Sequence, residues 1–217
     1  SRFVHFLKRF IICGFLATQF SCNNPNNPDD RSVKQVMDNK ITELYAAKSP
    51  SELAVLNYQQ AKALFSPADL KILASRHWMF ETNVPVTVFV FRSKKQEMVP
   101  WWLAENGFTK TGLSVKNEHT EFEIWQKVFP AGRVGLGIDG FENYGLHYFV
   151  AVQPQQKTDQ LTLSKFFPEN QYVGVLQDSA FTYHDWDELV LTGVPDELKG
   201  AQLLTTIRGR GTEAHLV

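Results

Sequence analysis

The residues best suited to chemistry lie in one short run, Tyr183-His184-Asp185-Trp186-Asp187. Imidazole and carboxylate groups together can bind a divalent cation, and they can also act as acid and base. However, His184 and Asp185 are adjacent, so on a strand their side chains would point to opposite faces of the sheet. In a turn, Asp185 and Asp187 would more often bond to the backbone. His184, Asp185 and Asp187 are therefore candidate metal ligands, while a structural turn is the favoured interpretation.

Other signatures of catalysis are missing from the sequence. The six histidines follow no metal-binding spacing, there is no G-x-S-x-G motif, and both cysteines, Cys13 and Cys22, lie in the first 22 residues. The glycines of Gly135-Leu136-Gly137-Ile138-Asp139-Gly140 are spaced as in a phosphate loop, but apolar residues alternate with them as in a strand. Close sheet packing or a turn at Asp139-Gly140 is the better explanation. The sequence thus predicts no catalytic residue and no cofactor-binding residue within this chain.

Aromatic residues offer a binding function instead. Trp101, Trp102, Trp125 and Trp186 could form exposed rings that stack on sugars or hold a protein partner. The favoured alternative is that these rings fill the core or a seam between helices and sheet. A formal net charge of −1 argues against a nucleic-acid partner, because such binding needs a basic surface.

The first 22 residues have the layout of an export signal. Arg2, Lys8 and Arg9 precede an apolar run over residues 10–20, which is too short to span a bilayer comfortably. Ser21-Cys22 follows, and then a polar tether over residues 23–31 rich in Asn and Pro. The segment resembles a bacterial lipoprotein signal, in which the cysteine after the cleavage point is lipidated. We therefore expect an exported protein of the cell envelope that is anchored to the membrane through Cys22, although an uncleaved membrane-anchoring helix is an alternative.

After the tether, the spacing of the apolar residues is first typical of helices and then typical of strands. Apolar residues at helical spacing and Ser-Pro starts at 49–50 and 66–67 predict three helices, near 32–48, 50–65 and 67–78. From residue 84 onwards, short β-branched and aromatic runs separated by Gly, Pro and Asn predict strands, with one helical turn over 99–107. The run over 84–91 is apolar on both faces, as in a buried strand, and the run over 121–129 alternates apolar and polar residues. The expected architecture is α+β: a helical lead-in over 32–80 and an antiparallel β-sandwich, Ig-like or fibronectin-like, over 81–217.

Several segments together resemble a known family. They are residues 77–90, 125–141, 147–152, 181–192, 203–210 and 213–217. These segments resemble the region that precedes the catalytic part in exported bacterial metallophosphoesterases similar to purple acid phosphatases. The resemblance implies that the chain continues beyond 217 into a fibronectin-like domain and then into a calcineurin-like phosphatase domain with a dinuclear metal centre. The metal-binding motifs of that domain, D-x-H, G-D-x-x-Y and G-N-H, do not occur in these 217 residues.

Three functions follow as hypotheses. The favoured one is a non-catalytic accessory module of an exported metal-dependent phosphoesterase, with the downstream catalytic domain of the same chain as its partner. The second is a separate cell-envelope module that binds carbohydrate or protein through its Trp residues. The third is a small hydrolase with a site around His184 and Asp187.

Overall fold

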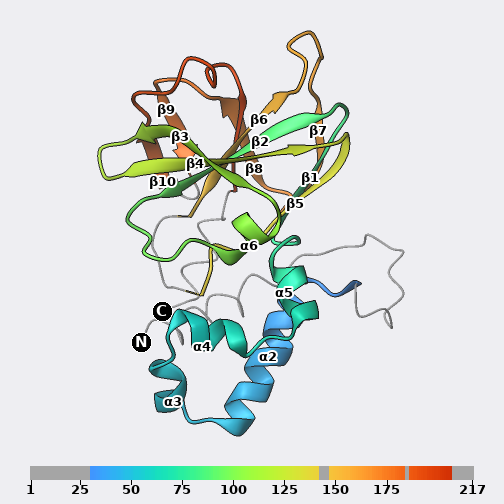
Figure 1. Ribbon diagram of the computed structural model, residues 1–217, viewed down its shortest axis with the longest axis vertical. Helices are drawn as coiled ribbons and strands as arrows, with labels where there is room; N and C mark the ends of the chain where they lie inside the picture. Colours follow the sequence, from blue (N-terminus) through green and yellow to red (C-terminus); the bar gives the residue numbers. More distant parts are fainter. Residues whose placement is uncertain (1–29, 142–146, 184–185, 207–217) are drawn as a thin grey trace. The chain divides into compact units, whose positions relative to one another are not determined.

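The computed structural model describes residues 30–141, 147–183 and 186–206. Backbone contacts divide the chain into two compact units. Among the described residues, the first unit contains 30–77 and 136–141, and the second contains 78–135, 147–183 and 186–206. Figure 1 follows the chain from its helical part into its strands.

The first unit contains four described helices, each started by a capping box. They are α2 (Val33–Ala47), α3 (Pro50–Ala54), α4 (Tyr58–Ala63) and α5 (Pro67–Leu73). The N-cap residues Ser32, Ser49, Asn57 and Ser66 each accept a hydrogen bond from the backbone of the residue three positions on, whose side chain bonds back. These pairs satisfy backbone donors that the first turn of a helix would leave without partners.

Two sequence-based expectations for this unit were wrong in detail. A single helix was expected over 50–65, but Asn57 begins a capping box of its own, so that α3 and α4 are separate. The last helix was expected to reach Trp78, but α5 ends at Leu73 and Trp78 begins strand β1. Local capping by an Asn and strand pairing by a Trp thus overrode the helical spacing of the apolar residues.

A segment from the middle of the chain completes the first unit. Phe141 stacks on Phe65 with ring centroids 5.2 Å apart, and it meets Tyr58 edge-on at 5.8 Å. Backbone bonds from Ile138 to Leu73 (2.9 Å) and from His77 to Leu136 (3.0 Å) hold the same segment. The helices therefore fold together with residues that are far from them in sequence.

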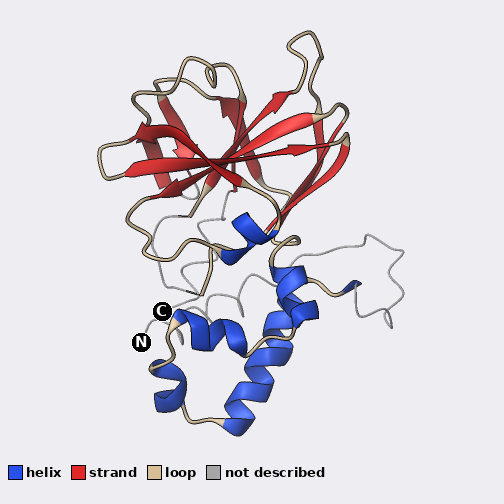
Figure 2. Cartoon of the chain, in the orientation of Figure 1, coloured by secondary structure: helices blue, strands red, loops and turns tan. Residues whose placement is uncertain are grey.

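The second unit consists mainly of strands (Figure 2). The largest sheet has six strands in the order β3-β4-β2-β6-β11-β8, and all its neighbours pair antiparallel. A three-stranded sheet has the order β5-β1-β7, and β9 and β10 form a two-stranded sheet. The strands are β1 (Trp78–Thr82), β2 (Val86–Ser93), β3 (Thr109–Lys116), β4 (Glu121–Phe129), β5 (Gly132–Leu136), β6 (Phe149–Pro154), β7 (Leu163–Phe167), β8 (Gln171–Val175), β9 (Ala180–Tyr183), β10 (Trp186–Val190) and β11 (Gln202–Thr206).

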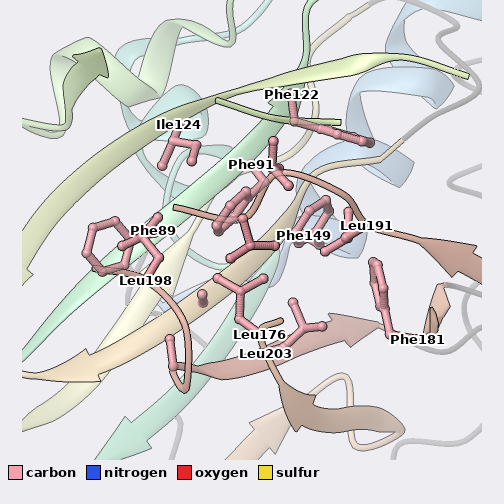
Figure 3. Packing of buried hydrophobic residues seen from close by; sticks show 14 of the residues in the cluster. Phe89, Phe91, Phe122, Ile124, Phe149, Leu176, Phe181, Leu191, Leu198 and Leu203 are labelled. Carbon is pink, nitrogen blue, oxygen red and sulfur yellow. The ribbon is translucent and has the colours of Figure 1, made fainter. Parts of the chain in front are cut away.

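The principal core lies on one face of the six-stranded sheet (Figure 3). Phe91 of β2 stacks on Phe149 of β6 at 4.6 Å, and Phe149 also meets Phe122 of β4 at 5.1 Å. Phe181 from β9 packs on Phe149 at 5.4 Å, so the β9–β10 hairpin contributes to this core. Leu176, Leu198 and Leu203 belong to the same cluster.

The opposite face of this sheet is also buried along the central strands β2 and β6. Val88, Val90, Val150 and Val152, which pair across β2 and β6, are all at most 1% exposed. The short helix α6 (Trp101–Glu105) is followed by Gly107, which has a positive φ of 80° and ends the helix as expected. Phe108 then packs on Phe129 of β4, with ring centroids 6.0 Å apart. The expectation that β2 lies inside with apolar residues on both faces is confirmed.

The described chain is therefore α+β, with a helical lead-in followed by predominantly antiparallel sheets. Of the strands, β4 was predicted with its observed bounds, whereas β1, β3 and β9 were not predicted. β3 was missed because its sequence, TKTGLSVK, is mostly polar and it lies at an edge of the sheet.

Candidate functional site

The run with the strongest chemical signal, 183–187, lies largely outside the described residues. His184 and Asp185 lie outside the described residues, and of Asp187 only the backbone is described, as part of β10. The proposed turn or metal site at His184, Asp185 and Asp187 therefore stays a prediction. The backbone register of the hairpin is irregular between Trp186 and Glu188, at the end of this run.

Within the described ranges, no group of three or more His, Cys, Asp or Glu side chains could hold a metal ion. His119 is exposed and His77 and His147 are half-buried. The residues that the structure describes thus do not fit a dinuclear metal centre, and none of them is assigned to one.

The tryptophan side chains that the structure describes do not supply the exposed rings that a carbohydrate-binding face would need. Trp101 is 8% exposed and Trp102 is fully buried, so the expectation that these rings fill the interior is confirmed for both. Trp125 is half-buried, and its Nε1 donates to Glu123 Oε1 at 2.9 Å. The side chain of Trp186 lies outside the described residues.

The glycine-rich run has a structural role. Gly135 lies in β5, and the segment after it belongs to the helical unit through the bonds of Leu136 and Ile138 described above. Gly140 has a φ of 132°, which favours glycine. The expectation that the run forms part of a strand is therefore confirmed for Gly135 and Leu136.

One cluster of charged side chains is buried in the six-stranded sheet. Arg92 of β2 and Glu123 of β4 lie directly opposite each other in the strand register, and both are at most 5% exposed. Arg92 Nη1 donates to Glu123 Oε1 at 2.7 Å. Directly opposed positions on antiparallel strands point to the same face, so the pairing of β2 with β4 creates this contact.

Three further groups complete the Arg92–Glu123 cluster. The Trp125 indole shares Glu123 Oε1, as noted, and Lys110 of β3 reaches Glu123 Oε2 at 2.5 Å. The other end of the Arg92 guanidinium donates to the backbone oxygen of Gln96, in the segment that follows β2. The cluster thus joins three neighbouring strands and one connecting segment.

The surroundings hold Glu123 in its ionised form. Burial by itself raises the pKa of Glu123, but hydrogen bonds from Lys110, Trp125 and Arg92 outweigh burial, and the net pKa is lowered. A carboxylate with a lowered pKa is a poor general acid or base near neutral pH, because it has little tendency to take up a proton. Its oxygens are also already occupied by donors. The arrangement suits a structural ion pair better than a catalytic one.

The cluster could not be recognised from the sequence because Glu123 alternates with apolar residues as on an exposed strand face. The available signal was the apolar run of β2, which has buried residues on both faces and is followed directly by Arg92. A sheet covered on both faces must bury the polar residues that continue its alternation, and a buried charge needs a partner.

The helical unit has a smaller pair of the same kind. Asp69 is 9% exposed, accepts from Ser66 within its capping box, and bonds to Arg31 at 2.6 Å. Burial raises the pKa of Asp69, but the bonds from Ser66 and Arg31 lower it by more. Asp69 therefore fixes the start of α5 and holds the residues before α2.

Comparisons with known protein families, curated proteins and solved structures found no match to this chain. None of the described helices is long and apolar enough to cross a membrane. The apolar run over 10–20 and Cys22 lie outside the described residues.

Proposed function

We propose that this chain is a non-catalytic, amino-terminal accessory module of an exported metal-dependent phosphoesterase, and that it positions a catalytic domain further along the same chain. The observation that supports this proposal is that the buried charged side chains in the described ranges are paired with one another or with neighbours inside the module. Asp69, Arg92 and Glu123, which are the buried charged residues in the described ranges, are all held in ion pairs within the module. Groups bound in this way maintain a shape and are not available for a reaction.

The location of the family resemblance supports the same function. Residues 77–90 form β1 and most of β2, residues 125–141 contain the end of β4, β5 and the segment packed on the helices, and 147–152 contain most of β6. β2 and β6 are inner strands of the six-stranded sheet, and β1 and β5 belong to the three-stranded sheet. A resemblance carried by strands and packing segments is what we expect of an accessory module without catalytic residues of its own.

The proposed metal centre belongs to the downstream domain. There, Asp, His and Asn side chains of the D-x-H, G-D-x-x-Y and G-N-H motifs would hold two metal ions, which activate a water and stabilise the transferred phosphoryl group. No residue described here takes part.

Reading the gene beyond codon 217 tests the proposal directly. The three motifs should follow in one open reading frame within a few hundred codons. A stop codon directly after Val217, or a downstream domain without these motifs, would refute the phosphoesterase assignment.

Export and lipid anchoring at Cys22 form the second part of the proposal. Cells fed labelled palmitate should incorporate it into the wild-type protein and into a Cys13→Ala variant, but not into Cys22→Ala. The Cys13 variant is the matched control, because it removes the other cysteine of the same segment. Equal labelling of the wild type and Cys22→Ala would rule out Cys22 as the anchor.

We also propose that the β-rich unit is related in architecture to Ig-like or fibronectin-like sandwiches. The antiparallel pairing and the core shared by the six-stranded sheet and the β9–β10 hairpin support this. The proposal concerns the layering of strands, since six strands in one sheet differ from the four-plus-three division of an Ig constant domain. An experimental structure in which β9 and β10 do not cover the sheet would refute it.

A further inference from the structure

The two edge strands of the six-stranded sheet differ in how they are protected. β3 carries Lys110 and Lys116, its register with β4 is interrupted between Lys110 and Ser114, and Lys116 pairs with Thr192 in an isolated bridge. Charges, bulges and partial covering are the usual devices that prevent an edge strand from pairing with another chain. β3 is therefore a protected edge.

β8, at the other edge, is less protected: Gln171 at its start accepts a hydrogen bond from Trp78 Nε1 at 2.9 Å, but the residues after it have none of these devices. Residues 170–177, NQYVGVLQ, contain no charged side chain. The register of β8 with β11 runs without interruption from Gln171 to Val175. Val173 is 49% exposed and Val175 is 55% exposed. A regular, uncharged edge with exposed β-branched residues is a template for pairing with another strand.

The backbone groups that β8 presents outward follow from its pairing with β11. Leu176 donates its N–H to Ala201 and accepts from Gly200, both at 2.9 Å, so residue 176 faces β11. Residues along an antiparallel strand alternate in the side to which they bond. Tyr172 and Gly174 therefore face β11 as well, whereas Gln171, Val173 and Val175 direct their N–H and C=O groups away from it. Among the described residues, no strand pairs with that side.

We propose that β8 forms a two-fold interface with β8 of a second copy of this chain, antiparallel and centred on Val173. A two-fold interface requires a strand that is complementary to itself. In this register Val173 lies opposite Val173 of the second copy, Gln171 lies opposite Val175, and Tyr172 lies opposite Gly174. Each opposed pair with outward groups exchanges two hydrogen bonds, which gives about six in total.

The side chains of β8 are compatible with pairing to a second copy of the same strand. Tyr172 lies over Gly174 of its own strand, with its hydroxyl oxygen 2.6 Å and its ring carbon Cε1 2.7 Å from where a Cβ would stand. Aromatic side chains that cover a glycine on an edge strand stabilise the register of a sheet. Across the two-fold axis, Glu169 would lie opposite Gln177, so no like charges oppose each other. The interface is short, and we therefore expect a weak dimer that forms with rising concentration.

Sedimentation equilibrium of the 217-residue chain between about 1 and 300 µM tests the dimer, since this range covers weak association. Val173→Pro removes an outward N–H only, and proline is tolerated at such edge positions. Val173→Lys places like charges opposite each other across the axis. Both variants should stay monomeric with melting temperatures near that of the wild type at low concentration. Val128→Lys is the matched control, because Val128 is a similarly exposed valine (56%) on the inner strand β4, and it should dimerise like the wild type.

Cysteine cross-linking tests the register in a Cys13→Ser, Cys22→Ser background. Opposed Cα atoms of a hydrogen-bonded pair lie about 5.5 Å apart, which is compatible with a disulfide. Val173→Cys should form an intermolecular disulfide under mild oxidation, whereas Tyr172→Cys and Val128→Cys should not. A wild type that is monomeric at every concentration would overturn the proposal. The same result is expected if another part of the same chain covers β8, and the proposal would then be wrong as well. A dimer that survives both Val173 variants, or that cross-links equally through Val128→Cys, would also overturn it.

Discussion

The buried Arg92–Glu123 cluster makes the clearest prediction about stability. Replacing Glu123 by Leu leaves the Arg92 guanidinium, 4% exposed, without its counter-charge. Breaking a buried ion pair from one side costs about 3–5 kcal/mol of unfolding free energy. Arg92→Met should cost less, about 2 kcal/mol, because Glu123 keeps its bonds from Lys110 and Trp125.

The double variant, Arg92→Met with Glu123→Leu, isolates the interaction energy between the two charges from the energy of their other contacts. It removes both buried charges and also Arg92 Nε, a buried donor without a partner among the described residues. What remains is the loss of an acceptor for Trp125 and Lys110 and of the donor to the Gln96 backbone oxygen, each worth about 1 kcal/mol or less. The two single changes should therefore be non-additive by about 2 kcal/mol or more.

Urea unfolding followed by circular dichroism at neutral pH measures these free energies. Glu121→Leu is the matched control, because Glu121 lies two residues away on the same strand and its pair with Lys94 is solvent-exposed. Surface pairs contribute about 0–1 kcal/mol. A Glu123→Leu cost as small as that of Glu121→Leu would refute the burial of the cluster, and additive single effects would refute the coupling.

The pH dependence of the wild type provides a second check on the same reasoning. The pKa of Glu123 is lowered in the folded state from its ordinary value of 4.5. The unfolded chain therefore binds a proton first as the pH falls. The contribution of Glu123 to stability is present above pH 4.5 and is lost as the pH falls through the lower folded-state pKa. The double variant should lack this part of the acid sensitivity.

Three further predictions concern the core, the edge strand and the absence of chemistry. Phe89→Ala should cost about 3–5 kcal/mol in urea unfolding, against less than about 0.5 kcal/mol for Val128→Ala at an exposed site; equal costs would contradict the placement of β2. Gly174→Ala should destabilise by about 1–3 kcal/mol because the new Cβ meets the Tyr172 ring, whereas Gly112→Ala, with nothing within 4 Å, should be nearly neutral by the same measurement. The 217-residue chain should neither hydrolyse p-nitrophenyl phosphate nor retain stoichiometric metal after dialysis; retained metal, measured by atomic absorption, would make the 183–187 run a ligand site.

Local signals in the sequence were sufficient for the ends of several elements. The Ser-Pro starts at 49–50 and 66–67 are helix starts because a capping box involves only four consecutive residues. The alternation of β4 predicted its bounds correctly, and the run of β2 predicted burial on both faces. The sequence by itself therefore determined that a helical part precedes an antiparallel β part, and that β2 lies inside.

Contacts between distant residues required the tertiary structure. Arg92 and Glu123 are 31 positions apart. No local feature of the sequence indicates that β2 and β4 pair, or that their register places these two residues opposite each other. The same holds for Phe141 and Phe65, whose stacking brings the segment after β5 onto the helices. An alternating strand shows which side chains share a face, but not whether that face is covered. Only the packing of the other elements decided that Glu123 is a buried, paired carboxylate and that β8 is an open edge among the described strands, because burial depends on neighbours that the local sequence does not contain.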